Sequence, residues 1–103
     1  MKKRLLIMLF FSVLIFQSCK KEKTPQACFT YTDNGGMSGH YLSFKNCSTN
    51  AYYYEWNFGN GDSRSTVKEP NEYFSSGTYT VTLTVFSSSE SKKDITTQTI
   101  TLY

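Results

Sequence analysis

The most regular stretch of the chain alternates apolar and polar residues from Thr78 to Val85. Tyr79, Val81, Leu83 and Val85 point to one side, and threonines occupy the other. A period of two residues is typical of a β-strand with one buried face, and no helical period competes with it here. Shorter alternating segments predict further strands at residues 27–31, 41–44, 52–58 and 100–102.

The inward faces of these expected strands are rich in aromatic residues. Besides those of 78–85, they comprise Ala27, Phe29, Tyr31, Leu42, Phe44, Tyr52, Tyr54, Trp56, Phe58, Ile100 and Leu102. Ile95 has the opposite parity to Ile100 and Leu102, so we expect a bulge between them or a turn at Ile95. Clusters of Gly, Asn, Asp and Ser separate the strands at short intervals, which predicts a β-sandwich or a small barrel.

The N-terminal residues follow a different pattern. Lys2, Lys3 and Arg4 precede the apolar run Leu5–Phe16. A transmembrane helix needs roughly 20 apolar residues, so this shorter run predicts a signal peptide over residues 1–18.

The residues that end this segment, Phe16-Gln17-Ser18-Cys19, resemble the signal of bacterial lipoproteins. The resemblance implies that Cys19 is acylated, for example with palmitate, and becomes the mature N-terminus. Residues 19–26 then form a short, charged, flexible tether. Because Lys20 is not Asp, the resemblance implies sorting to the outer membrane, with the leaflet left open. The alternative is an ordinary secretory signal.

The positive net charge of the chain comes from its N-terminal residues. The whole chain carries a net +3, but residues 1–18 account for +3 and residues 19–23 for +2, so the remainder is slightly acidic. A nucleic-acid partner is therefore not expected, because such binding needs a surplus of Lys and Arg. Catalysis is not expected either: His40 is the single histidine, no nucleophile motif is present, and the acidic residues are scattered among turns.

Three motifs, in order, closely resemble the PKD (polycystic kidney disease) domain. They are Tyr54-Glu55-Trp56-Asn57-Phe58-Gly59-Asn60-Gly61-Asp62-Ser63, Pro70-Asn71-Glu72-Tyr73, and Gly77-Thr78-Tyr79-Thr80-Val81-Thr82-Leu83-Thr84-Val85. The resemblance implies an all-β, immunoglobulin-like β-sandwich of about seven strands over residues 27–103. It further implies an extracellular module that contacts protein or carbohydrate without catalysis. Its structural positions are Tyr54, Trp56, Phe58, Gly59, Gly61, Pro70, Tyr73, Gly77, Tyr79, Val81, Leu83 and Val85.

Cys28 and Cys47 are predicted to form a disulfide. Lipidation removes Cys19 from the count, the setting outside the inner membrane is oxidising, and the first two strands of an immunoglobulin-like order are neighbours. Closing a loop of about 20 residues contributes about 3 kcal/mol to stability on the chain-entropy model. The alternatives are two free thiols or a metal site with His40, and that spacing makes a weak zinc signature.

The segment around Gly59 and Gly61 offers oxygen donors for a cation. Asn57, Asn60 and Asp62 lie there, but only Asp62 is charged, because amides replace the two carboxylates that are common in the family. Calcium sites rely on several carboxylates, so the favoured interpretation is a tight turn. We expect no metal and no cofactor.

A binding surface is expected on outward tyrosines. If Tyr54 and Trp56 face the core, Tyr53 must face out, joined by Tyr52 and Tyr41. Such rings suit flat contacts with protein or with sugar rings, although they are also ordinary sheet-surface residues. The sequence thus predicts a lipid-anchored, non-catalytic interaction module of the bacterial cell envelope. The alternatives are a structural spacer or accessory subunit, and a carbohydrate-binding module.

Overall fold

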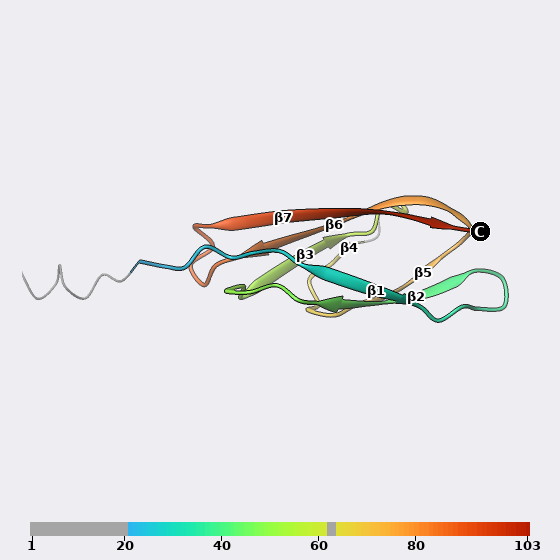
Figure 1. Ribbon diagram of the computed structural model, residues 1–103, viewed down its shortest axis with the longest axis horizontal. Coiled ribbons are helices and arrows are strands. Elements are labelled where there is room, and N and C mark those ends of the chain that lie inside the picture. Colours follow the sequence, from blue (N-terminus) through green and yellow to red (C-terminus); the bar gives the residue numbers. More distant parts are fainter. Residues whose placement is uncertain (1–20, 62–63) are drawn as a thin grey trace, which may run out of the picture.

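A computed structural model describes residues 21–61 and 64–103, which form seven β-strands (Figure 1). They are β1 Phe29–Asp33, β2 His40–Asn46, β3 Tyr53–Asn57, β4 Arg64–Ser65, β5 Asn71–Phe74, β6 Gly77–Phe86 and β7 Lys93–Leu102. The predicted signal peptide, Lys20 and the predicted acylation site at Cys19 lie outside the described residues, as do Asp62 and Ser63. No helix in the described part of the chain is long and apolar enough to cross a membrane.

The strands form two antiparallel sheets that pack face to face. One sheet has the order β1-β2-β5 and the other β4-β3-β6-β7. The expected all-β, immunoglobulin-like sandwich of about seven strands is therefore confirmed. The longest ladder joins β6 to β7, from Gly77 opposite Leu102 to Phe86 opposite Lys93.

The core is the aromatic interior that the alternation predicts. Trp56 is fully buried, its ring centroid lies 5.0 Å from that of Phe29 and 5.3 Å from that of Phe44, and its Nε1 donates to the carbonyl of Val67 at 2.9 Å. The buried apolar residues are Phe29, Leu42, Phe44, Trp56, Phe58, Phe74, Val81, Leu83, Val85, Ile100 and Leu102. Large rings give a small domain much buried apolar area per residue.

The structure corrects the expectations for Ile95, Tyr52 and Tyr31. Ile95 is 52% exposed and pairs with Thr84 in an unbroken ladder, so the expected bulge or turn at Ile95 is wrong. Its odd parity simply places it on the outer face. Tyr52, which was placed both on an inward face and among the surface tyrosines, precedes β3 and is 64% exposed, so the surface position is the one observed. Tyr31 lies at the rim of the core with 39% exposure.

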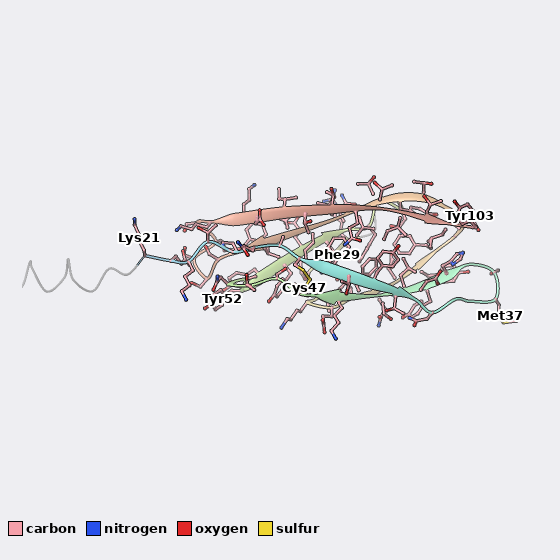
Figure 2. All side chains as sticks on the ribbon, viewed as in Figure 1. Lys21, Phe29, Met37, Cys47, Tyr52 and Tyr103 are labelled. Atoms are coloured by element: carbon pink, nitrogen blue, oxygen red, sulfur yellow. A yellow bond between two sulfur atoms is a disulfide. The ribbon has the colours of Figure 1, made fainter. Side chains whose placement is uncertain are left out.

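The described residues of the tether make specific contacts with the sandwich. Pro25 is buried, and Gln26 and Thr49 exchange two backbone hydrogen bonds of 2.9 and 3.0 Å. The N–H of Ala27 donates to Oδ2 of Asp94 at 2.8 Å. Figure 2 shows Lys21 and Tyr52 at one end of the molecule, the tether end, and Met37 and Tyr103 at the other, the loop end.

Candidate functional site

Two of the three predicted surface tyrosines lie together at the tether end. Tyr52 and Tyr53 are 64% and 51% exposed, and Tyr53 pairs with Phe86 on the outer face of the four-stranded sheet. They border an open hollow of about 410 Å³, lined by Tyr52, Tyr53, Tyr54, Glu55, Thr66, Phe86 and Glu90. The hollow is shallow and mixed in polarity, which suits a surface contact better than an enclosed small molecule.

Tyr41 lies on the outer face of the other sheet, so the structure does not bring it together with Tyr52 and Tyr53. Its direct cross-strand partner is Tyr73 of β5, and these two residues are 45% and 48% exposed. We call them the tyrosine pair. Side chains opposite each other on one sheet face lie close enough to act as one surface.

The β1–β2 loop packs against the ring of Tyr73. A Cβ on Gly39 would lie 2.3 Å from the hydroxyl oxygen of Tyr73, so only a glycine leaves room for the ring in this position. The hydroxyl groups of Ser38 and Tyr73 lie 3.3 Å apart. Tyr73 is thereby held in one orientation by the loop.

Tyr73 was expected to have only a structural role. Its position on the surface follows from its neighbour Phe74. Phe74 is buried, and adjacent residues of a strand face opposite sides of the sheet.

Hydrogen-bonding side chains continue the surface beside the tyrosine pair. Ser43 of β2 pairs with Thr32 on one side and Asn71 on the other. A second open hollow, of about 380 Å³, is lined by Thr32, Ser43, Phe44, Lys45, Glu69 and Asn71. The arrangement offers two aromatic rings followed by hydroxyl, amide, ammonium and carboxylate groups, which can stack against a ligand and hydrogen-bond with it.

Several of the motif residues pack in the core of the sandwich. Trp56 and Phe58 stack in the core with centroids 6.1 Å apart, and Val81, Leu83 and Val85 are fully buried.

The hydroxyl of Tyr79 donates to the carbonyl of Ser75 at 2.8 Å. A tyrosine that bonds the backbone a few residues upstream is a feature of immunoglobulin-like sandwiches.

Comparison with known proteins agrees with this geometry. The sequence profile described as the PKD domain matches residues 26–100. The chain belongs to the PKD domain family. PKD domains are in general non-catalytic β-sandwich modules, and no curated protein is similar enough to this chain to count as a match.

Two crystal structures of PKD domains resemble the chain. The PKD1 domain of Vibrio anguillarum Epp is 29% identical with a TM-score of 0.67, and the match covers 80% of this chain and 96% of that one. The PKD1 domain of the Vibrio cholerae metalloprotease PrtV is 32% identical with a TM-score of 0.66, covering 78% and 98%.

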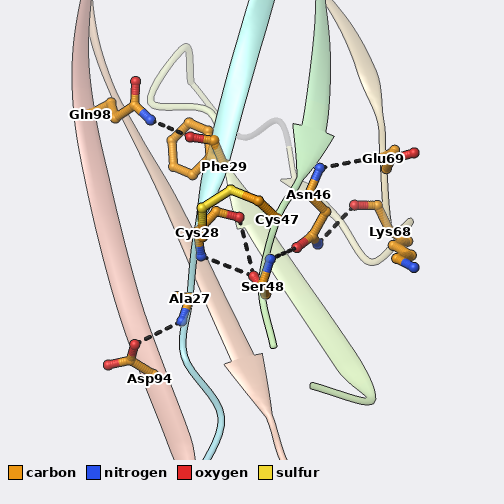
Figure 3. Close-up of a disulfide and its surroundings, with 10 residues drawn as sticks. All are labelled: Ala27, Cys28, Phe29, Asn46, Cys47, Ser48, Lys68, Glu69, Asp94 and Gln98. Carbon is orange, nitrogen blue, oxygen red and sulfur yellow. Dashed lines mark hydrogen bonds between the residues drawn. A yellow bond between two sulfur atoms is a disulfide. The ribbon is translucent and has the colours of Figure 1, made fainter. Parts of the chain in front are cut away.

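This PKD domain contains the predicted disulfide. Cys28 and Cys47 are bonded, with their Cα atoms 4.8 Å apart, and the N–H of Cys47 donates to the carbonyl of Cys28 at 2.9 Å (Figure 3). The bond joins the residue before β1 to the residue after β2. Ser48 also holds the backbone of Cys28. Its hydroxyl accepts the N–H of Cys28 at 3.0 Å and donates to the carbonyl of Cys28 at 3.2 Å.

The Gly59–Gly61 segment of the PKD domain is built as a turn. Oδ1 of Asn57 accepts the N–H of Gly59 at 3.0 Å, and Gly59 has a φ of 71°. Asn60 donates to Glu72 at 3.1 Å, which ties the turn to β5. Asp62 lies outside the described residues, and among the residues that are described no group of three or more His, Cys, Asp or Glu side chains could hold a metal ion.

His40 is occupied by structural hydrogen bonds. Its Nδ1 lies 2.7 Å from Oδ2 of Asp33, and its Nε2 lies 3.0 Å from the backbone oxygen of Tyr103. Both partners are acceptors, so the imidazolium with two N–H groups is favoured, and the hydrogen bond to Asp33 followed by that to Tyr103 raises the pKa of His40. The N–H of Gly35 and then the imidazole lower the pKa of Asp33. These bonds fasten β2 and the β1–β2 loop to the residue that follows β7.

Proposed function

We propose that this PKD domain is a lipid-anchored interaction module of the bacterial cell envelope that binds a polysaccharide through the tyrosine pair. The observation that carries the proposal is the cross-strand pairing of Tyr41 with Tyr73, both about half exposed on the same sheet face. Aromatic rings of this kind stack on the apolar faces of sugar rings, and the adjoining Ser43, Asn71 and Thr32 supply hydrogen bonds to hydroxyl groups.

The anchor rests on the N-terminal sequence. Three basic residues, a twelve-residue apolar run and Ser18-Cys19 stand in the order of a lipoprotein signal. Acylation at Cys19 would keep the module at a membrane, because each buried methylene adds about 0.8 kcal/mol and two or more chains give stable attachment. Lys20 at the following position favours the outer membrane.

Polysaccharide binding is tested with the mature protein by electrophoresis through gels that contain one of a panel of bacterial or plant polysaccharides. We expect at least one polysaccharide to retard the protein. Tyr41→Ala and Tyr73→Ala should each lower its affinity about tenfold, since stacking on one ring contributes roughly 1 to 1.5 kcal/mol. Tyr53→Ala removes an equally exposed ring from the opposite face and serves as the matched control.

If no polysaccharide retards the protein, or if Tyr53→Ala has the same effect as Tyr41→Ala, the glycan proposal is wrong. A protein partner or a spacer role then remains, and cross-linking in intact cells separates these two. A reproducible cross-linked neighbour that depends on Tyr41 would indicate a protein partner.

The anchor is tested separately by the mass and location of the mature protein. We expect a mature chain that begins at Cys19, carries acyl chains and sediments with outer membranes. Cys19→Ser should release the protein from the membrane while leaving the Cys28–Cys47 disulfide intact. A mature chain without added acyl mass would contradict the anchor and would leave the ligand-binding proposal standing.

A further inference from the structure

The tether meets the domain at the turn between β6 and β7, which we call the serine turn (residues 87–92). The carboxylate of Glu22 accepts hydrogen bonds from the hydroxyls of Ser88 and Ser89, each at 2.5 Å, and from that of Ser91 at 2.9 Å. It also accepts the backbone N–H of Ser89 at 2.6 Å. Four donors from one short turn therefore converge on a single carboxylate.

The backbone of the serine turn is held by hydrogen bonds of its own. Glu90 has a φ of 64° and its N–H donates to the carbonyl of Ser87 at 2.9 Å, so the turn closes on itself and its hydroxyls face the same side. Ser87 is completely buried, and its hydroxyl accepts the N–H of Lys92 at 3.1 Å. Hydrogen bonds to a charged acceptor are roughly twice as strong as neutral ones, which makes the turn a good carboxylate binder.

A fifth contact fixes the direction of the tether. The ammonium of Lys92 donates to the backbone carbonyl of Glu22 at 2.7 Å. Since Cys19 precedes Glu22 by three residues, its Cα lies at most about 11 Å from that of Glu22. An acyl group on Cys19 would therefore be attached three residues before the contact with the serine turn.

The surface around the serine turn suits a lipid boundary. Tyr52 and Tyr53 lie at the same end, because Phe86, the residue before the turn, accepts the N–H of Tyr52 at 2.9 Å and pairs with Tyr53. Exposed tyrosines are favoured at membrane interfaces, where the ring meets apolar groups and the hydroxyl meets water.

Lysine side chains are also present at this end. The basic residues are Lys21, Lys23, Lys92 and Lys93, and they are matched in number by the acidic residues Glu22, Glu55, Glu90 and Asp94. Glu22, Asp94 and Lys92 are hydrogen-bonded within the protein, whereas exposed basic side chains near a membrane are attracted to anionic lipid.

We propose that Ser88, Ser89 and Ser91 form a carboxylate-binding site that captures Glu22 and so seats the tether end against the headgroups of an anionic lipid surface. The orientation rests on the lipid anchor proposed above, whereas the capture of Glu22 does not. With the tether end on the membrane, the tyrosine pair faces sideways and the loop end points away from the lipid.

The capture is tested first, with the mature acylated protein in detergent micelles. The amide proton of Ser89 should resonate downfield, as expected for an N–H bonded to a carboxylate, and Glu22→Gln should shift it upfield. Glu90→Gln removes the same charge from the same turn and should leave the Ser89 amide in place. An unchanged Ser89 resonance in Glu22→Gln would overturn the proposal, whatever the state of the anchor.

The orientation is tested with the same protein in vesicles of phosphatidylethanolamine and phosphatidylglycerol that contain a headgroup quencher. A fluorophore is attached to a cysteine introduced either at Lys93, at the tether end, or at Met37, at the loop end. We expect quenching at residue 93 to exceed that at residue 37 severalfold. Glu22→Gln and the triple variant Ser88→Ala/Ser89→Ala/Ser91→Ala should each reduce this ratio at least twofold, and Glu90→Gln should not.

The outcomes separate the two proposals. Protein that fails to float with the vesicles shows that the anchor is wrong, and the orientation falls with it. Protein that floats but quenches equally at residues 93 and 37 overturns the seating and leaves the anchor intact. A strong ratio that survives Glu22→Gln and the triple serine variant would show that the serine turn does not set the orientation.

Discussion

Each end of the sandwich contains a carboxylate that is held by hydrogen bonds, Glu22 at the tether end and Asp33 at the loop end. The groups that bind these two carboxylates differ in kind. At the tether end, Glu22 is bound by hydroxyl and amide groups that keep their protons at all ordinary pH values. At the loop end, Asp33 is paired with His40, which can lose its proton. The first contact therefore depends on one ionisation and the second on two, so the same type of acid gives two different responses to pH.

The ends also differ in covalent support. Next to the tether, the Cys28–Cys47 bond ties β1 to β2, whereas at the loop end β2 is held by the hydrogen bonds of His40. The tether end is thus held in part by a covalent bond that does not depend on protonation, whereas the hydrogen bonds of His40 at the loop end do. Substitutions and titrations at each end test this difference.

The largest effect is expected from removing the disulfide. Cys28→Ala/Cys47→Ala should lower the free energy of unfolding by about 3 kcal/mol, because the unfolded chain is freed from a closed loop of about 20 residues. Denaturant titration measures it, with the wild type in a reductant as the comparison. A loss below about 1 kcal/mol would contradict the assumed difference between the two ends.

The next effect is expected at Gly59, which lies toward the loop end. A Cβ there would lie 2.4 Å from the carbonyl oxygen of Thr80, and the φ of 71° is strained for any side chain. Gly59→Ala should cost about 2 to 3 kcal/mol, again by denaturant titration.

Gly35→Ala is its matched control, because Gly35 has nearly the same φ of 72° with no heavy atom within 4 Å. It should cost about 1 kcal/mol, from strain alone. Equal losses for the two variants would show that the contact with Thr80 is unimportant.

A smaller, pH-dependent effect is expected at His40. Its folded pKa is raised, so its contribution is fully present below the unfolded value of 6.5 and is lost as the pH rises through the folded pKa. The pKa of Asp33 is lowered, so that contribution is lost only as the pH falls through the folded pKa of Asp33, below the ordinary 3.8. The difference in melting temperature between wild type and His40→Gln should therefore shrink from pH 5.5 to pH 8.5. A difference independent of pH would mean that the imidazolium is not the stabilising form.

The smallest effect is expected at Glu22, and in another pH range. The hydrogen bond from the hydroxyl of Ser88, followed by those from Ser89, lowers the pKa of Glu22 to about 2. The contact with the serine turn is therefore complete above the ordinary value of 4.5 and is lost as the pH falls through about 2. The carboxyl carbon resonance of Glu22 should titrate near pH 2, and a midpoint near 4.5 would contradict the contact. Between pH 5.5 and 8.5, where His40 changes, Glu22 should not respond.

Much of the fold could be predicted from the alternation of apolar and polar residues, because a long strand shows the period of two clearly even where single residues depart from it. β6 alternates without a break, and its neighbours Trp56 and Phe58 belong to a recognisable family motif. Ile95 misled the prediction because an isoleucine was taken as a sign of the core, whereas strict parity with Ile100 already placed it outside.

The surface contacts could not be predicted in the same way. Glu22 meets donors 66 to 69 residues further along the chain, and His40 meets a carbonyl 63 residues away. Neither composition nor local pattern brings such groups together, so the tether looked like a free linker. Only one residue of the tyrosine pair was predicted from the sequence. Tyr41 was expected to be exposed, but its pairing with Tyr73 could be known only once β2 and β5 were seen to be neighbours.

The position of the disulfide has a mechanical consequence. A pull on the tether first loads the contacts of Glu22 with the serine turn and then the Gln26–Thr49 bridge and Ala27, and one residue later the load meets the covalent bond between Cys28 and Cys47. Because these cysteines are 19 positions apart, the whole β1–β2 hairpin between them is bypassed and cannot be drawn out. Tension on the tether passes directly into the end of β2, so the hairpin, including Tyr41, keeps its length under a load that would extend an unbridged chain.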